Sequence, residues 1–326
     1  MMRPPMRSAH IPATMLILCA APLWAEVPVV MTDIPPVHAL VAQVMGELGN
    51  PVLLLEPGGD AHDFQLRPSQ ASALADADAI FWVGPELTPW LDRALVVAPD
   101  ADSVPLLGTA GTVLRAYGDS DAIADSEALP GVGGDQEAPM PVSPEPGGPA
   151  GHGNLDPHAW LDPTNAEIWL GRIADELSSL DPGNSITYRA NASLAQTAIA
   201  ALDTDLQARL DPARNAPIVV AHDALGYFAN HFGLSIAATI SAGDAARPGA
   251  AHLSKIRALL EKGGVACIFP GALDDPSRVE LLADGTGTAI GGALDPEGRT
   301  LTPGPQLYTE LLSNLATTIS TCVAPP

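Results

Sequence analysis

Short apolar runs alternate with helical patterns along most of this sequence, and this alternation constrains the fold more than any other feature. The candidate strands lie at 27–32, 52–55, 79–83, 218–221, 235–240, 265–269 and 288–293. Helical patterns follow at 37–48, 69–75 and 86–97, and a last one covers 306–321. Strands that alternate with helices form βα units, which build mainly parallel sheets. The sequence therefore predicts an α/β fold.

One long helical pattern divides the strands into two groups. Leucine and alanine recur every four residues from Leu194 to Leu210, and prolines at 182 and 212 bound the pattern. A helix there would have about 25 residues and a length of about 38 Å. The chain has 326 residues, of which 47% are hydrophobic, which is enough for two lobes. We predict a first lobe over 26–183, a linker helix over 184–211 and a second lobe over 212–326.

The N-terminal sequence is typical of an export signal. Arg3 and Arg7 precede an apolar stretch over 15–23, and small residues surround Ala25. We predict a cleaved signal peptide over 1–25 and a destination outside the cytoplasm. Lipidation at Cys19 is the less favoured alternative, because Leu18 stands where a lipoprotein signal has a small residue. No later stretch has the roughly 18 consecutive apolar residues of a membrane span.

Acidic residues outnumber basic ones strongly. The chain has 38 acidic and 15 basic residues, a formal charge of −23, and loss of two arginines with the leader would make it −25. Such a surface repels nucleic-acid phosphates, so we expect no nucleic-acid partner. It is compatible with a cationic ligand. The stretch at 118–153, rich in Gly, Pro, Asp, Glu and Ser, is expected to be a mobile surface loop.

Two cysteines remain after the leader, Cys267 and Cys322. An exported protein meets an oxidising compartment, so a disulfide is the natural interpretation of this pair. The alternative is a pair of thiolate metal ligands. Cys267 lies within an apolar run that predicts a buried strand, and it has no second thiol nearby in the sequence, which favours the disulfide.

Three of the eight histidines stand next to an acid in a loop or at the end of a predicted strand: His62, His158 and His222. In open α/β sheets, ligands collect beyond the carboxyl ends of the strands. His62 and His222 follow such strands, and Asp295 follows another. Loops gathered at one edge can bring these four side chains together. Imidazole nitrogen suits Zn²⁺, whereas Mg²⁺, Ca²⁺ and Mn²⁺ prefer oxygen, so the set predicts a tetrahedral zinc site.

Four ordered segments of the chain resemble a known family. They are Gly59-Asp60-Ala61-His62-Asp63, Asp156-Pro157-His158-Ala159-Trp160, His222-Asp223-Ala224-Leu225-Gly226 and Leu294-Asp295-Pro296-Glu297-Gly298. In these segments, and over most of 27–322, the chain is similar to the solute-binding proteins of ABC-type zinc and manganese importers. It is most similar to their zinc-specific, ZnuA-like branch.

The resemblance implies a periplasmic protein that captures Zn²⁺ in the cleft between two lobes and delivers it to a membrane permease. His62 and His158 would bind the metal from the first lobe, His222 from the second, and Asp295 would supply a carboxylate. Manganese-type members usually have an acid where His222 stands, and the zinc branch commonly has a disulfide at the positions of Cys267 and Cys322. The same resemblance implies a long inter-lobe helix that limits lobe motion.

The chain departs from the family pattern at two places. The stretch at 118–153 is acidic and contains only His152, where zinc-specific relatives often have a histidine-rich loop. This makes a second zinc site there doubtful. Some relatives have an acid where Ala61 stands, so Asp295 is the better fourth ligand here, with water or Asp60 as alternatives.

The remaining alternatives concern the class of function. A manganese or ferrous-iron binding protein is the runner-up, and a zinc-dependent hydrolase is a different class. A hydrolase would need an open coordination position and a nearby base. The sequence contains no His-Glu-x-x-His, Gly-x-Ser-x-Gly or glycine-rich phosphate motif. We therefore expect a monomeric binding protein and no enzyme. His38, His231 and His252 are interpreted as structural or surface residues, and Asp63 and Asp223 as candidate partners for the neighbouring imidazoles.

Overall fold

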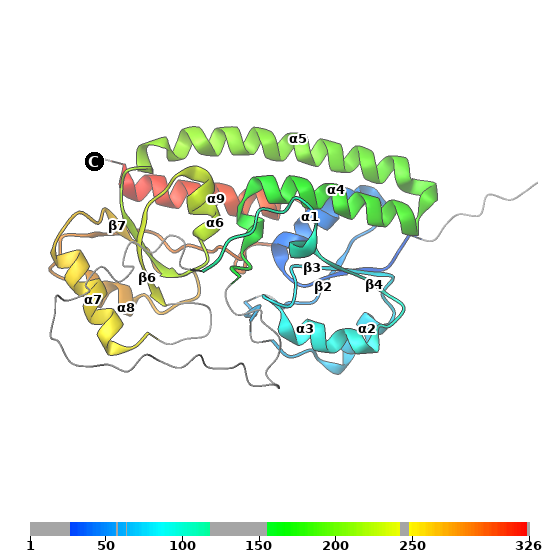
Figure 1. Cartoon of the computed structure of the whole chain (residues 1–326), viewed down its shortest axis with the longest axis horizontal. Helices are drawn as coiled ribbons and strands as arrows, with labels where there is room; N and C mark the ends of the chain where they lie inside the picture. Colours follow the sequence, from blue (N-terminus) through cyan, green and yellow to red (C-terminus); the bar gives the residue numbers. More distant parts are fainter. Residues whose placement is uncertain (1–26, 57, 63, 118–154, 242–247, 325–326) are drawn as a thin grey trace, which may run out of the picture.

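A computed structural model describes residues 27–56, 58–62, 64–117, 155–241 and 248–324 of the chain. The leader expected over 1–25 lies outside these residues, as does the surface loop expected over 118–153. Two groups of strands and an unbroken helix above them dominate the structure (Figure 1).

Two four-stranded sheets, each built of parallel strands, form the two lobes. The first contains β1 (Val30–Thr32), β2 (Val52–Leu53), β3 (Ala79–Trp82) and β4 (Asp102–Pro105) in the order β2-β1-β3-β4. The second contains β5 (Ile218–His222), β6 (Ile236–Ser241), β7 (Cys267–Ile268) and β8 (Ala289–Ile290) in the order β6-β5-β7-β8. The second sheet therefore repeats the strand order of the first. The predicted α/β class with parallel sheets is confirmed.

The sequence did not predict β4. This strand lies at the edge of the first sheet and pairs only with β3. Of its four residues only Val104 is buried, so the apolar run that marks an interior strand is missing. Pro105, which cannot donate to a ladder, is compatible with an edge position.

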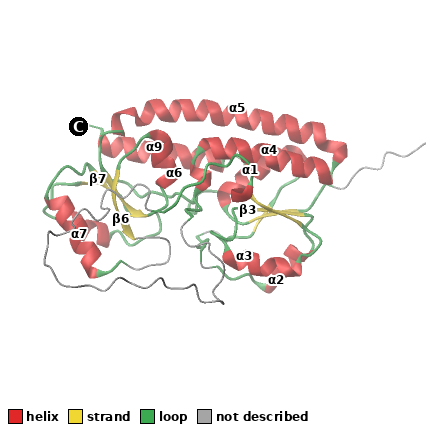
Figure 2. Ribbon diagram, in the orientation of Figure 1, coloured by secondary structure: helices red, strands yellow, loops and turns green. Residues whose placement is uncertain are grey.

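Nine α-helices of the described residues cover these sheets. They are α1 (Pro35–Met45), α2 (Pro68–Ala75), α3 (Pro89–Ala94), α4 (Pro163–Leu180), α5 (Ser185–Leu210), α6 (Gly226–Phe232), α7 (Ala250–Glu261), α8 (Ser277–Ala283) and α9 (Leu307–Val323). α2 and α3 pack on the outer face of the first sheet, and α7 and α8 on the outer face of the second. The inner faces meet a shared layer formed by α1, α4, α5 and α9 (Figure 2).

α5 is the long helix expected between the lobes, and it spans 26 residues. Tyr188 and Ala192 in its first half and Leu206 and Leu210 in its second are all buried, and they belong to one continuous apolar cluster. That cluster includes side chains from both sheets and from α1, α4 and α9. The two lobes therefore share a core. No helix in the described ranges, α5 included, is long and apolar enough to cross a membrane.

The buried face of α5 differs from the one that the leucine repeat indicates. Leu194, which begins that repeat, is 71% exposed, and the buried stripe passes instead through Tyr188, Ala192, Ala195 and Ile199. A helix turns about 100° per residue, so a strict four-residue repeat drifts about 40° at each step. Five such residues cannot all stay on one face, and only Leu206 and Leu210 of the repeat reach the core fully.

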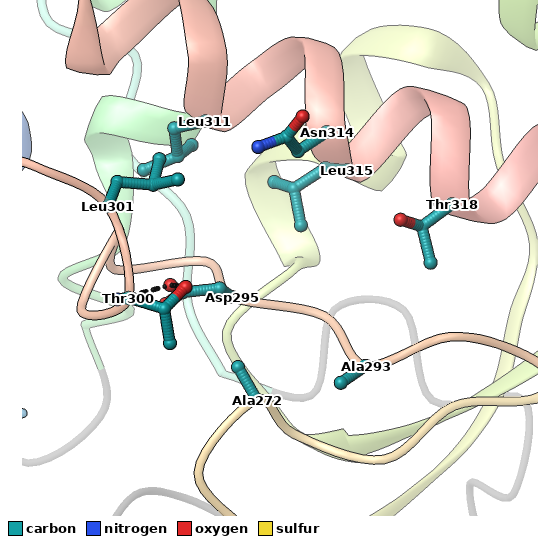
Figure 3. Close-up of a pocket in the computed structure, with 9 residues that line it drawn as sticks. All are labelled: Ala272, Ala293, Asp295, Thr300, Leu301, Leu311, Asn314, Leu315 and Thr318. Atoms are coloured by element: carbon teal, nitrogen blue, oxygen red, sulfur yellow. Dashed lines mark hydrogen bonds between the residues drawn. The ribbon is translucent and has the colours of Figure 1, made fainter.

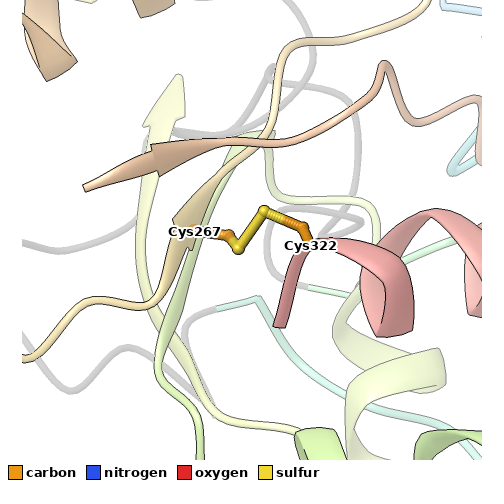
Figure 4. The surroundings of a disulfide bond; sticks show 2 residues. All are labelled: Cys267 and Cys322. Atoms are coloured by element: carbon orange, nitrogen blue, oxygen red, sulfur yellow. A yellow bond between two sulfur atoms is a disulfide. The ribbon is translucent and has the colours of Figure 1, made fainter. Parts of the chain in front are cut away.

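A disulfide joins Cys267 of β7 to Cys322 near the end of α9, as expected (Figure 4). The bond closes a loop over a sequence separation of 55 residues. In the chain-entropy model, a loop of this size stabilises the folded state by about 4 kcal/mol. With both sulfurs in this bond, the alternative of two thiolate metal ligands is excluded.

An ionic cluster ties α6 to two other helices. His231 of α6 lies with Nδ1 3.0 Å from Asp162 Oδ1 and Nε2 2.7 Å from Asp203 Oδ1. Asp162 caps α4 by accepting from the Thr164 N–H, and Asp203 belongs to α5. Burial of the ring lowers its pKa, but the hydrogen bonds and charges of the two carboxylates outweigh burial and raise the pKa of His231 to about 9. The ring is a fixed cation at neutral pH.

This raised pKa predicts how stability depends on pH. A histidine whose pKa is about 6.5 unfolded and higher when folded contributes its full stabilisation below about pH 6.5, and loses it as pH rises through the folded value. We expect the unfolding free energy of the wild type, relative to His231→Gln, to fall by about 3 kcal/mol between pH 6 and pH 9.5. Urea unfolding at several pH values measures this difference, and a difference that stays constant would contradict it.

Candidate metal centre

His158 lies in a buried segment that leads into α4. It precedes a short 3₁₀ turn, Ala159–Leu161, and its side chain is fully buried. Asp156 Oδ1 lies 2.8 Å from its Nδ1 and also accepts its backbone N–H at 3.0 Å. A carboxylate that takes the Nδ1 proton fixes the tautomer and directs Nε2 toward a metal.

Asp156 is itself buried and faces a cation. Its Oδ2 lies 3.6 Å from Arg115 Nη1, and the two side chains are 1% and 9% exposed. The sequence interpretation had considered Asp63 and Asp223 as partners of the imidazoles and had missed Asp156. Asp63 lies outside the described residues, and Asp223 is buried next to His222 in the chain. The Asp-Pro-His spacing was the available signal, because an aspartate often accepts the backbone N–H two residues ahead.

His222 is the last residue of β5, the strand beside β7 in the centre of the second sheet. The chain passes from β5 outward to β6 and then returns to β7, so a topological switch point lies between β5 and β7. Ligands of open α/β sheets bind at such points, beyond the carboxyl ends of the strands. His222 is half-buried and lines a small cavity together with Leu225, Leu294 and Pro296.

His62 lies in the loop between β2 and α2, and contacts from two directions hold this loop. Its backbone N–H donates to Asp60 Oδ1 at 2.9 Å. The carbonyl of Ala61 accepts from Trp90 Nε1 at 2.7 Å, within the first lobe. Arg299 Nη2 of the second lobe donates to the Gly58 carbonyl at 2.8 Å. The loop is therefore held by both lobes.

The three imidazole rings come together although they are far apart in sequence. The centre of the His158 ring lies 5.8 Å from that of His62 and 5.8 Å from that of His222. Nitrogens about 2.1 Å from a tetrahedral zinc would place ring centres about 5 Å apart. Among the described residues, no three His, Cys, Asp or Glu side chains are already placed to hold a metal ion. The two ring-centre distances of 5.8 Å are somewhat longer than this value.

Asp295 is not placed with these rings. Its Oδ1 accepts from the Arg299 N–H at 2.9 Å, and its Oδ2 accepts from Thr300 N–H and Oγ1 at 2.8 and 2.6 Å. Its side chain lines a cavity of about 370 Å³ below α9, beside Asn314 and Thr318 (Figure 3). The adjacent residues Leu294 and Pro296 line the cavity at His222 instead. Asp295 therefore points to the other side of its loop.

Comparisons with known proteins show the family of the chain. The model of the family described as "ZnuA: Zinc-uptake complex component A periplasmic" matches residues 30–322. A protein of Paracoccus denitrificans named "High-affinity zinc uptake system protein ZnuA" is 43% identical over 326 residues, and the match covers 99% of each chain. This chain belongs to the ZnuA family.

Solved structures show that the ZnuA fold is shared more widely. A crystal structure of ZnuA has a TM-score of 0.71 and 21% identity, and the match covers 91% of this chain and all of that one. A Mn-bound periplasmic metal-binding protein from candidatus liberibacter asiaticus has a TM-score of 0.70 and 20% identity over the same shares. At these identities the likeness concerns the fold alone. The choice of metal must come from the donor atoms.

The other described histidines make hydrogen bonds that do not involve these rings. His38 Nε2 lies 3.2 Å from the Pro51 carbonyl, and burial lowers the pKa of His38. His252 Nε2 lies 2.8 Å from the Thr239 carbonyl, and His231 is held between its two carboxylates. The structural interpretation of these three residues is therefore supported. His152 and His10 lie outside the described residues.

The buried Asp156 should be needed both for stability and for the His158 tautomer. Asp156→Asn leaves the buried Arg115 cation without its carboxylate, and loss of one partner of a buried ion pair costs about 3 kcal/mol. Urea unfolding measures this cost, and Asp205→Asn, which breaks an exposed pair with Arg209, is the control. Nitrogen NMR should show His158 protonated on Nδ1 in the wild type and a mixture of tautomers in the variant. The same tautomer in both would contradict the assignment.

Proposed function

We propose that this protein captures Zn²⁺ in the periplasm and delivers it to the permease of an ABC-type importer. The short distances from the His158 ring to the rings of His62 and His222 carry the proposal, because these imidazoles come from separate parts of two lobes. The family model and the zinc-uptake names of the relatives support the same function. The signal expected over 1–25 and the Cys267–Cys322 disulfide are in keeping with export to the periplasm.

The donor set favours zinc over manganese or ferrous iron. Three neutral imidazoles suit Zn²⁺, whereas Mn²⁺ prefers a larger share of oxygen ligands. His222, the ligand from the second lobe, would be the deciding residue, because an acid there would shift the set toward oxygen. The fold is common to zinc and manganese proteins, so only this choice of atoms separates the two.

A binding protein also fits the site better than a hydrolase. A zinc hydrolase requires a water on the metal and a carboxylate or imidazole placed to take its proton. Asp156, the buried acid beside His158, is hydrogen-bonded to that ring and faces Arg115. It orients a ligand and is not disposed as a general base. We propose that the protein acts as a monomer that holds its cargo without chemical change.

The first test compares metals and histidine variants. Equilibrium dialysis should show Zn²⁺ retained in the presence of excess Mn²⁺, and His222→Ala should lower zinc affinity at least a hundredfold because one of three imidazole ligands is lost. His252→Ala is the matched control, since His252 bonds only to a backbone carbonyl of its own lobe. A preference for Mn²⁺, or equal affinities in the two variants, would reject the function.

Asp295 remains the proposed fourth ligand, and its geometry makes that proposal testable. To reach the rings, its carboxylate must leave Thr300, whose hydroxyl it accepts at 2.6 Å. If Asp295 binds zinc, Thr300→Val should raise or preserve zinc affinity, and Asp295→Ala should lower it about tenfold. Calorimetric titration measures both. If Asp295→Ala lowers only the melting temperature, the carboxylate supports its loop and the fourth ligand is water or Asp60.

A further inference from the structure

Helix α6 of the second lobe contacts both ends of the segment that carries His158. This segment, 156–162, begins with Asp156 and ends with Asp162. Tyr227 and His231 lie four residues apart on α6, and residues at this spacing project from the same face of a helix. One face of α6 therefore lies along the whole segment.

At the first end, the Tyr227 hydroxyl joins two backbone groups of the first lobe. It donates to the Asp156 carbonyl at 3.0 Å and accepts from the Arg115 N–H at 2.8 Å. The Asp156 N–H donates to the Arg115 carbonyl at 3.0 Å, so the hydroxyl completes the pairing between these two stretches. Tyr227 is 1% exposed, and water has little access to replace its hydroxyl.

Gly226 lets the Arg115 side chain pass directly over the start of α6. A Cβ at this position would overlap Arg115 Nη1 and lie 2.9 Å from Asp156 Oδ2. The Arg115 guanidinium lies 5.5 Å from the centre of the Tyr227 ring, a distance at which the ring face attracts a cation. α6 thus positions the cation that faces the carboxylate partner of His158.

At the second end, His231 fixes Asp162. The carboxylate of Asp162 lies 3.0 Å from His231 Nδ1 and also caps α4. The other nitrogen of His231 is held by Asp203 of α5 at 2.7 Å. The end of the segment is therefore tied to α6 and to the long helix at once.

We infer that α6 is the element that positions His158 for zinc, with Tyr227 and His231 as positioning residues at the two ends of its segment. The inference rests on the proposed function. His222 lies only four residues before the start of α6, on the same short stretch of the second lobe. α6 then provides a short structural path between His158 and His222.

Tyr227→Phe tests this positioning by removing only a hydroxyl. Tyr188→Phe is the matched control, because Tyr188 is also fully buried and its hydroxyl donates to Asp181 Oδ2 at 3.1 Å, away from the rings. Loss of a group that orients a metal ligand typically costs tenfold to a hundredfold in metal affinity. We expect Tyr227→Phe to lower zinc affinity about tenfold and to change the visible absorption spectrum of bound Co²⁺. Tyr188→Phe should change neither.

Two further variants keep the test decisive if Tyr227→Phe folds poorly. Gly226→Ala displaces Arg115 and should lower zinc affinity, whereas Gly171→Ala on α4 has room for its methyl group and should not. His231→Gln should lower zinc affinity as well. Because both ends act on one segment, the double variant Tyr227→Phe/His231→Gln should lose less affinity than the product of the two single losses.

The same titrations, run with Zn²⁺ and a competing chelator, include His222→Ala as a reference. If His222→Ala loses zinc and the three α6 variants also weaken binding, the positioning role is supported. If His222→Ala loses zinc while folded α6 variants bind like the wild type, the positioning role is overturned and the function stands. If His222→Ala itself binds like the wild type, the zinc site is wrong and the positioning role is overturned with it.

Discussion

The packing of α5 against both lobes is the constraint on which the rest of the structure depends. One apolar cluster runs from the first sheet through α1, α4 and α5 to α9 and the second sheet. Each sheet is too small to bury both of its faces alone, and the shared layer covers the inner face of each. As a result the loop with His62 and the end of β5 with His222 both approach the buried segment that contains His158. The site is a consequence of how the two sheets are covered.

The charged groups around His158 bear on how neutral imidazole ligands would bind a divalent cation in the protein interior. Three neutral imidazoles leave the charge of the ion uncompensated. At the proposed site, Asp156 would supply part of the compensation through the ring of His158, since a carboxylate bonded to Nδ1 increases the basicity of Nε2. The Arg115 guanidinium faces that same carboxylate, with its Nη1 3.6 Å from Asp156 Oδ2. The remaining compensation falls to ligands outside the three rings, Asp295 among the candidates.

Much of this arrangement could be predicted from sequence, and each exception has its own physical cause. The βα alternation and the long helix depend on patterns local to the chain. The three histidines were selected by their neighbouring acids and by the resemblance to the family, and their role as ligands stays a prediction. The edge strand β4 was not predicted because Val104 is its only buried residue. The buried face of α5 was predicted wrongly because a four-residue repeat drifts around a helix. Tyr227 and His231 act through contacts that span up to 112 residues, and no pattern in a single sequence indicates such contacts. Asp156 had a local signal, its position two residues before His158. The direction of the Asp295 side chain, which its hydrogen bond to Thr300 sets, could not be predicted from the sequence either.

The continuous core affects how the protein resists proteolysis after export. Because side chains from both halves lie in one cluster, unfolding of one half would expose apolar surface of the other, which couples the unfolding of the two halves. An ion held where the halves meet then protects every part of the molecule, including the distant ends of α5, by mass action. Loaded and empty molecules would differ in how often they expose cleavable backbone to proteases. Metal supply could thereby set the amount of the carrier as well as its occupancy.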